Sequence, residues 1–378
     1  MQEYNTIIGN LFNSIDRRVF KKIVEKHNGE YYSKSFTCWE QFVCVFLGQI
    51  LKNCQSLRDI EDFLLSNQNQ WYHLGIRHPI ARSTLSYANN TKPWEIYGDL
   101  FNYLLHKTSC NKVINNVVTI IDSTPIYLNL NLFSWAEENL RIKGMKMHVV
   151  YNLNEQRPVY FTFTSPRIND VEEGKLVEII ANHTYVFDRG YMDFKWWGEI
   201  DDQGAYFVSR FKKNNAIVEL TEIQQCNEII SSQLIQLKHH CKGKVFRKVY
   251  VKREDKRPLE LITNDLSRSV EEISELYKQR WQIELFFKWV KQNLKIKKFI
   301  GRSENAVKTQ ICIAFIVYLL LSEAEEMKEI LSGMCNYFSN SKFLKMINNN
   351  IFKTLKTRKY YRCRDNPWQL KLNLLFQN

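Results

Sequence analysis

The chain has 378 residues, 44% of them hydrophobic, and its 53 Lys and Arg against 40 Asp and Glu give a net charge of +13. This length allows two or three domains with buried cores, and the charge favours nucleic acid over a membrane surface as the partner. The nine cysteines are odd in number and contain no C-x-x-C pair, which argues against a disulfide framework and predicts reduced, buried thiols in a cytosolic protein.

The apolar run 311–321 is shorter than the ~20 residues of a membrane span, so we expect a buried core helix there. The first residues also lack a basic-then-apolar signal segment. We therefore expect no membrane partner.

Residues 1 to about 110 are predicted to be helical. Thr37-Cys-Trp-Glu40 has the spelling of a capping box, and Ser56-Leu-Arg-Asp59 repeats the pattern before a second apolar run. Ser83 or Thr84 could cap a further short helix.

Several short helices in a basic chain are typical of a helix-turn-helix-like DNA-binding domain. The polar residues expected to contact phosphates and base edges are Arg82, Ser83, Thr84, Ser86, Tyr87 and Asn89. The alternative is a helical domain that packs against the rest of the chain or pairs subunits, and the sequence leaves both open.

From about residue 115 the pattern changes to short β-branched and aromatic runs. Strands are expected at 117–121, 147–151, 159–164, 185–187 and 205–209. Helices are expected from Asp170 through residue 180 and near 192–200. Asp122 follows the first of these strands and Asp188 follows the fourth.

Residues 211–262 read as a β-rich insertion before the next helix. Its runs 245–251 and 259–263 resemble strands, and it is dense in lysine: Lys212, Lys213, Lys242, Lys244, Lys248 and Lys252. We expect this insertion to lie along DNA.

The run YKQRWQIELFFKWVK at 277–291 is predicted to be one helix, because it has no Gly or Pro and its apolar residues recur at helical spacing. At about 100° per residue, one stripe roughly 80° wide holds Tyr277, Arg280, Glu284, Lys288 and Lys291. A neighbouring apolar stripe holds Leu276, Ile283, Phe286, Phe287, Val290 and Leu294. Cations at this spacing suit phosphate oxygens, and a carboxylate among them suits a divalent metal. The alternative is an amphipathic helix with a solvated charged face.

The spelling of the first stripe resembles the Tyr-Arg-Glu-Lys signature of DDE transposases of the insertion-sequence-four family, and the resemblance continues through residues 301–321. It covers roughly residues 35–325, and its other strong motifs contain Asp122 and Asp188. The resemblance implies a ribonuclease-H-like α/β catalytic core with a β-rich insertion, preceded by an all-helical N-terminal domain. In such a core the first and fourth strands are neighbours, so that Asp122 and Asp188 lie at adjacent strand ends beside Glu284.

The resemblance implies that Asp122, Asp188 and Glu284 are the catalytic residues and bind Mg²⁺, for which Mn²⁺ can substitute. Two such ions would activate a water or 3′-hydroxyl and stabilise the leaving oxygen. The implied activity is endonuclease cleavage and strand transfer at terminal inverted repeats, cut-and-paste and through hairpin ends. The implied partners are double-stranded element-end and target DNA, and a homodimer in the synaptic complex.

Phosphate contacts are expected from Tyr277, Arg280 and Lys291, with Lys288 on the same stripe but outside the signature. Lys143 and Lys146, in a stretch with His148 that is common in this family, are further DNA-binding candidates. Some family members hold a flipped base with a Trp of the insertion. Residues 211–262 contain no Trp, so Phe246 or Tyr250 would have to take that role.

We expect three parts: a helical DNA-binding domain at 1–110, a catalytic domain at 111–325 with its insertion at 211–262, and a basic C-terminal region at 326–378. The expected location is the bacterial cytoplasm, at the nucleoid. Two alternatives stay open, a ribonuclease-H-like nuclease that cuts without joining and a decayed copy that only binds DNA.

Overall fold

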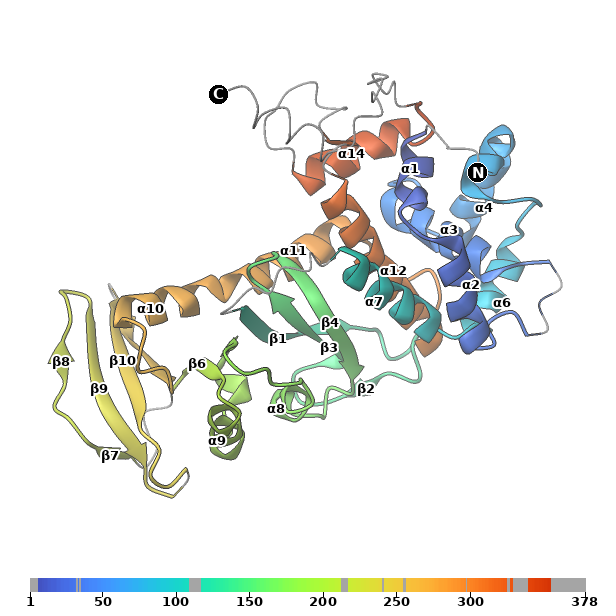
Figure 1. The fold of residues 1–378 in the computed structure, drawn as a ribbon. Helices are drawn as coiled ribbons and strands as arrows, with labels where there is room; N and C mark the ends of the chain where they lie inside the picture. Colours follow the sequence, from blue (N-terminus) through green and yellow to red (C-terminus); the bar gives the residue numbers. More distant parts are fainter. Residues whose placement is uncertain are drawn as a thin grey trace, which may run out of the picture.

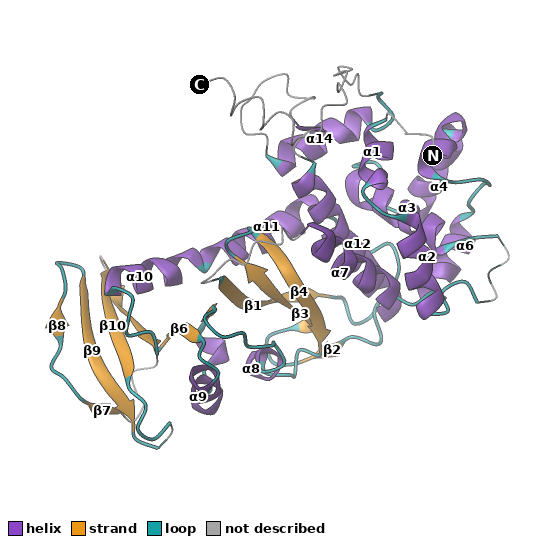
Figure 2. Ribbon diagram, viewed as in Figure 1, coloured by secondary structure: helices purple, strands orange, loops and turns teal. Residues whose placement is uncertain are grey.

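The structure is a computed structural model, and it describes residues 6–31, 33, 35–108, 117–211, 217–239, 241–253, 256–296, 298–324, 327–328 and 339–354. Figure 1 shows a helical part that contains the N-terminal helices, a central sheet with helices on both faces, and a β-rich extension at the opposite end. Figure 2, which colours helices and strands differently, shows the same helical part, central sheet and β-rich extension.

Among the described residues up to Thr108, all regular secondary structure is helical. The helices are α1 (Ile7–Asn13), α2 (Arg17–Lys26), α3 (Cys38–Ile50), α4 (Leu57–Ser66), η1 (Gln68–Gln70), α5 (Trp71–Leu74), α6 (Arg82–Thr91) and α7 (Glu95–Thr108). The capping box of Thr37 and Glu40 is present, and Ser56 caps α4. The expected cap by Ser83 or Thr84 is wrong, because α6 begins at Arg82 after Ala81 without a side-chain cap.

One helix from the far end of the sequence completes this helical part. It is α12 (Glu304–Glu323), and it lies against α3, α6 and α7. By length and composition α12 could cross a membrane, but 78% of its most apolar window is buried inside the protein. It is the buried core helix that the apolar run predicts.

The described strands form one eleven-stranded sheet. They are β1 (Val118–Tyr127), β2 (Glu137–Glu138), β3 (Lys143–Asn152), β4 (Arg157–Thr164), β5 (Thr184–Phe187), β6 (Tyr206–Arg210), β7 (Ile217–Glu219), β8 (Gln224–Gln225), β9 (Ile230–Leu237), β10 (Phe246–Arg253) and β11 (Lys256–Thr263). In the core of the sheet β4 and β3 are antiparallel, β3 and β1 are antiparallel, and β1, β5 and β6 are parallel. The first and fourth expected strands, β1 and β5, are therefore neighbours.

Two expectations about this core are wrong in detail. β1 does not end before Asp122 but runs on to Tyr127, because its antiparallel pairing with β3 continues after its pairing with β5 stops at Ile121. The helix that starts at Asp170 is short: α8 (Asp170–Gly174) ends at Gly174, and Leu176 and Ile180 are exposed. A side chain at Gly174 would lie 2.9 Å from the ring of Tyr191, so only glycine fits there.

Different helices cover the two faces of the sheet. On one face lie α10 (Val270–Gln279), α11 (Trp281–Asn293) and α12, and on the other lie α8 and α9 (Phe194–Asp202), as Figure 1 shows. Alternate residues of a strand point to opposite faces. Accordingly Ile120 and Val186 belong to the α11-side core, whereas Ile121 and Phe187 belong to the α9-side core.

The β-rich insertion is present, and β11 joins it to β6 of the main sheet. Two of its lysines have structural partners: Lys244 pairs with Asp201 and Asp202 of α9, and the buried Lys248 pairs with Glu260. The Lys244 ammonium holds the insertion to α9, and the Lys248 ammonium joins two strands of the insertion. Neither position favours contact with DNA. Lys212 and Lys213 lie outside the described residues.

The C-terminal region contributes α14 (Asn340–Asn350), and residues 355–378 lie outside the described residues. Six cysteines are described and all are free thiols. The expectation of buried thiols holds for Cys38, Cys44, Cys54 and Cys312, whereas Cys226 is exposed and Cys241 is half-buried.

Thr37→Ala should lower the free energy of unfolding by about 1 kcal/mol, because the Thr37 hydroxyl accepts a hydrogen bond from the Glu40 amide. Ser83→Ala should change it by less than about 0.5 kcal/mol, since the exposed Ser83 caps nothing. Urea unfolding of both variants measures the difference. Equal effects would contradict the assigned caps.

Candidate active site

The predicted helix at 277–291 is two helices in line, with Arg280 at the junction. α10 ends at Gln279, α11 begins at Trp281, and Arg280 between them keeps helical backbone angles of φ −50° and ψ −28°. The expected apolar stripe is buried, with Ile283 and Val290 fully so. That burial turns Arg280 and Glu284 toward β1, against which α11 lies.

The guanidinium of Arg280 joins two of the three predicted acidic residues. Its Nη1 donates to Oδ2 of Asp122 at 2.9 Å, and its Nη2 pairs with Oε1 of Glu284 one helical turn further on. All three side chains are largely shielded from water, with exposed fractions of 15% for Arg280, 14% for Asp122 and 33% for Glu284. The central strand and α11 are thus joined through one cation.

Asp188 stands directly after β5, at the start of a short turn η2 (Arg189–Tyr191). Its Oδ1 accepts a hydrogen bond of 2.7 Å from the Gly190 amide, and its carbonyl accepts one from the Ser209 hydroxyl of β6. A Cβ at Gly190 would lie 2.9 Å from that same Oδ1. A methyl group at this position would therefore press on the carboxylate and displace it.

Burial raises the pKa of Asp122 to about 7, although Arg280 opposes the shift, and the charges of Asp188 and Glu284 raise it further. The three carboxylates are therefore close enough to repel one another. Bringing them together requires compensating positive charge. Arg280 supplies part of it in this structure.

The donor set can be tested against a divalent cation. Carboxylate oxygens are the hard ligands that Mg²⁺ prefers, and three of them converge here from two strands and a helix. Across the described part of the chain, no three Asp, Glu, His or Cys side chains are already arranged around one metal position. The donor chemistry thus fits such an ion, while Arg280 now holds Asp122 and Glu284 and the Gly190 amide holds Asp188.

Two other residues of the predicted stripe lie close to these acids. Tyr277 of α10 is buried, which raises its pKa, and its ring lies 5.9 Å from the Arg280 guanidinium. Lys291 donates to the Thr124 hydroxyl and to the Pro125 carbonyl of β1, at 3.1 Å for the latter. Lys288 is exposed on the same helix.

The two lysines predicted from the stretch at 143–148 have different positions. Lys143 is exposed and pairs with Glu138. Lys146 is buried on the opposite face of the sheet, where its ammonium donates to Asp170 and to the Ile168 carbonyl. This position does not favour the predicted phosphate contact for Lys146. His148 is also buried and bonds Thr164.

Other predicted DNA contacts divide in the same way. Arg82, Ser83, Thr84 and Tyr87 are exposed on α6, but Asn89 is buried and its side chain accepts a hydrogen bond from Gln41. Phe246 is fully buried and cannot stack on a base, and Tyr250 donates its hydroxyl to Gln233. Asn89 and Phe246 are thus corrected to core positions.

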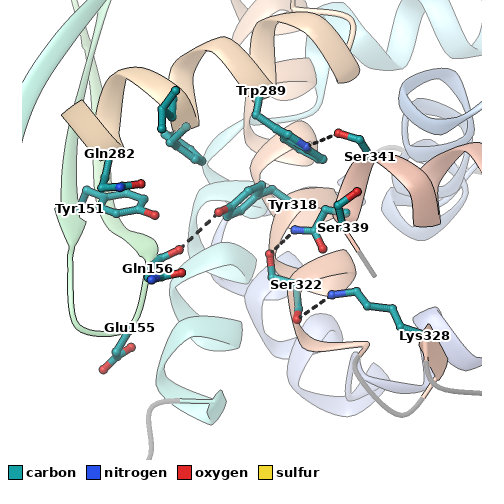
Figure 3. Close-up of a pocket in the computed structure, with 13 residues that line it drawn as sticks. Tyr151, Glu155, Gln156, Gln282, Trp289, Tyr318, Ser322, Lys328, Ser339 and Ser341 are labelled. Atoms are coloured by element: carbon teal, nitrogen blue, oxygen red, sulfur yellow. Dashed lines mark hydrogen bonds between the residues drawn. The ribbon is translucent and has the colours of Figure 1, made fainter. Parts of the chain in front are cut away.

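A cavity of about 420 Å³ lies between α11, α12 and α14, and Figure 3 shows residues that line it. Trp289 and Tyr318 line it, and the Trp289 indole donates to Ser341 of α14 at 2.8 Å. Its lining includes none of the three acidic residues. It is separate from the candidate site.

Sequence reasoning missed two residues that the structure places next to the acids. Asp170 was expected only as a helix start, and Gly190 only as part of a motif. The signal for Asp170 was the Lys146-x-His148 spacing, which puts two basic side chains on one face of β3, where an acid must neutralise a buried lysine.

Comparison with known proteins identifies the class. The family described as the transposase DDE domain matches residues 115–320. Because the match covers more than half of the chain, the chain belongs to this family of DDE transposases. A second family, described as a domain of unknown function, matches residues 3–77.

The individual relatives are transposases by name, and two of the names mention an insertion sequence element. A transposase of Sinorhizobium fredii is 36% identical over 257 residues, covering 65% of this chain and 72% of the relative. A transposase for insertion sequence element IS5377 of Geobacillus stearothermophilus is 29% identical, covering 69% and 74%. One for element IS4SA of Synechocystis is 26% identical, covering 74% and 80%. The prediction of a DDE transposase is confirmed.

The fold resembles that of the piggyBac transposase in its synaptic complex with hairpin DNA, solved by cryo-electron microscopy. The TM-score is 0.51 at 12% identity, with 98% of this chain and 84% of the other covered. This likeness concerns the mixed α/β fold alone.

The buried His148 predicts an acid-sensitive fold. Burial lowers its pKa to about 4, and the neighbouring Lys146 also lowers it, although Asp170 opposes the shift. The unfolded chain therefore binds a proton near pH 6.5 that the folded chain refuses until about pH 4, so stability falls as pH falls through this window. Protonation of His148 should lower the free energy of unfolding by up to about 3 kcal/mol across this window. His148→Gln should flatten the difference between pH 7 and pH 4.5 in urea unfolding, and His78→Gln at an exposed position should not. Identical pH profiles for wild type and His148→Gln would contradict it.

Proposed function

We propose that this chain is the transposase of a bacterial insertion sequence, which cuts DNA at the element's terminal inverted repeats and joins the ends to target DNA. The observation that carries the proposal is that Arg280 holds Asp122 and Glu284 together, while Asp188 lies near enough to Asp122 to raise its pKa. Membership of the DDE transposase family supports it, as do the insertion-sequence names of the relatives. A ribonuclease-H-like core is supported by the strand order β4-β3-β1-β5-β6.

Asp122, Asp188 and Glu284 would hold Mg²⁺, for which Mn²⁺ can substitute. When bound, such ions supply Lewis-acid stabilisation of the oxygens at the reacting phosphorus and lower the pKa of bound water. The chain's own side chains align the phosphate. Arg280 has a fork of donors that matches phosphate oxygens as well as the carboxylates that it now holds, and Lys291 presents a cation from the same helix.

The remaining parts have proposed roles in DNA binding and assembly. The exposed residues of α6, Arg82, Ser83, Thr84 and Tyr87, suit contact with the terminal repeats, within an N-terminal DNA-binding domain at 1–110. The catalytic domain spans 111–325, and 326–378 is a basic C-terminal region. Two element ends must be brought together, which favours a homodimer, and hairpin ends are the proposed route of excision. The protein acts in the bacterial cytoplasm, at the nucleoid.

The test is cleavage of a labelled DNA that carries the element's own end. Nicking at the end with Mg²⁺ and none with EDTA supports the proposal. Joining of pre-cut ends to a target plasmid separates a transposase from a nuclease that only cuts. Binding without cleavage under any metal would favour a decayed copy.

Removing any one carboxylate should abolish cleavage and leave DNA binding largely intact, because these acids are proposed to act on the reacting phosphate and not on the repeat. Asp122→Asn, Asp188→Asn and Glu284→Gln should each lower the cleavage rate at least about 100-fold. Glu275→Gln, on the exposed side of α10, is the matched control and should cut normally. Normal cleavage by Asp188→Asn would overturn the site assignment.

Gly190→Ala should slow cleavage at least about tenfold at saturating DNA, because its methyl group would lie 2.9 Å from Oδ1 of Asp188 and displace the carboxylate. Gly98→Ala on α7 is the control, since its nearest neighbour would be 3.6 Å away. Cleavage rates are compared after gel-shift titration. A wild-type rate for Gly190→Ala would show that Asp188 need not hold this position.

A further inference from the structure

A buried ion pair lies on the face of the sheet opposite α11, directly behind the turn that carries Asp188. Lys146 of β3 extends its ammonium to within 2.9 Å of Oδ1 of Asp170, the first residue of α8, and also donates to the Ile168 carbonyl. The Lys146 side chain is 8% exposed and that of Asp170 is 28% exposed. Figure 1 shows α8 on the side of β3 away from α11.

Asp170 faces Asp188 across the backbone of Gly190. A Cβ built on Gly190 would lie 3.6 Å from Oδ2 of Asp170 and 2.9 Å from Oδ1 of Asp188. The two carboxylates therefore approach the same point of the turn. Left alone, two like charges at this spacing would push the turn outward.

Tyr191, the last residue of the turn, connects α8 to Asp188 a second time. It is fully buried, and Gly174 at the end of α8 fits closely against its ring. Burial raises the pKa of Tyr191 well above its usual value, and the charges of Asp122, Asp170 and Asp188 raise it further. Because Gly174 packs against the Tyr191 ring, a shift of α8 would be transmitted to the turn.

His148 does not replace Lys146 as the cation for Asp170. Its Nδ1 lies 4.0 Å from Oδ1 of Asp170, but the lowered pKa keeps the imidazole neutral at pH 7. In the described ranges of the chain, Lys146 is thus the charged group within ion-pair distance of Asp170 at neutral pH.

Stability alone gives no reason for this pair. Two charges lose their hydration on burial, and well-packed apolar side chains of similar size usually stabilise a fold as well or better. The pair does have a reason if its role is geometric, since an ammonium bound to the Asp170 carboxylate and the Ile168 carbonyl fixes where α8 begins.

We propose that Lys146 and Asp170 are positioning residues that brace the Asp188–Tyr191 turn from behind and so hold the Asp188 carboxylate where it acts. The inference rests on the proposed function of Asp188. It assigns to Lys146 a role in place of the DNA contact expected from the sequence.

The test separates positioning from stability with an apolar double variant, Lys146→Met with Asp170→Leu. The matched control is Lys248→Met with Glu260→Leu, which removes another buried Lys–carboxylate pair at 2.9 Å, away from the acids. For each protein we would measure the melting temperature, binding of the DNA end, and the single-turnover cleavage rate at saturating DNA over a range of Mg²⁺ concentrations. Mn²⁺ binding to the protein–DNA complex, followed by electron paramagnetic resonance, adds a readout that does not depend on turnover.

If Lys146 and Asp170 position the turn, the double variant should have a melting temperature at or above that of either single variant and should bind DNA normally. It should nevertheless cut DNA at least tenfold more slowly, require more Mg²⁺ and bind Mn²⁺ more weakly. The control double variant should keep the wild-type cleavage rate, Mg²⁺ requirement and Mn²⁺ binding. A folded double variant that cuts at the wild-type rate with the wild-type Mg²⁺ requirement would overturn the proposal. If the double variant does not fold, Lys146→Met and Asp170→Asn take its place, and wild-type cleavage by either overturns it equally.

The comparison of the Lys146 and Asp170 variants tests the proposal only if the wild-type protein cuts the DNA and the Glu284→Gln variant does not. Failure of wild type to cut would count against the proposed function. Normal cutting by the brace variants, with Glu284→Gln inactive, would count against the brace alone.

Discussion

The contact on which this site depends is the guanidinium of Arg280 between Asp122 and Glu284. It joins the central strand β1 to the start of α11, through two residues, Asp122 and Arg280, that are 158 positions apart in sequence. Burial and the charges of Asp188 and Glu284 together raise the pKa of Asp122 to about 7, although Arg280 opposes the shift. A planar group with donors on two sides can hold two carboxylates at once, which a lysine ammonium at the same position could do only as a point charge.

The same fork would let Arg280 serve both the protein and the proposed DNA substrate. Phosphate oxygens and carboxylate oxygens present similar acceptors to a guanidinium. Removing one partner from a buried ion pair costs about 3–5 kcal/mol, so Arg280 can leave its carboxylates only where incoming groups replace both the positive and the negative charge. Divalent cations and a DNA phosphate together meet that requirement.

Much of this arrangement could be predicted from residue spacing. The 3.6-residue period identified the buried face of α11. Short β-branched and aromatic runs located β4, β5 and β6 to within two residues, whereas β1 and β3 are longer than predicted. The break at Arg280 could not be predicted, because no Gly or Pro marks it. Nor could the continuation of β1 through Pro125, a residue tolerated there because β5 has already stopped pairing at Ile121 and the missing amide is not needed on that side.

Charge was the least predictable property. The lysines Lys146, Lys244 and Lys248 contribute to the net charge that suggested a polyanionic partner, yet each is paired with a carboxylate inside the fold. A sequence shows how many cations a chain has but not which of them face solvent. That depends on which strand face each one occupies and on which acid the topology brings opposite.

The most direct test of the account is a structure of the complex with the element's end DNA and Mn²⁺, with the metal located by anomalous scattering. The account predicts Mn²⁺ bound by Asp122 together with Asp188 or Glu284, and the Arg280 guanidinium turned to a DNA phosphate. Mn²⁺ bound elsewhere, with Arg280 still bridging Asp122 and Glu284 in a complex competent for cleavage, would contradict it.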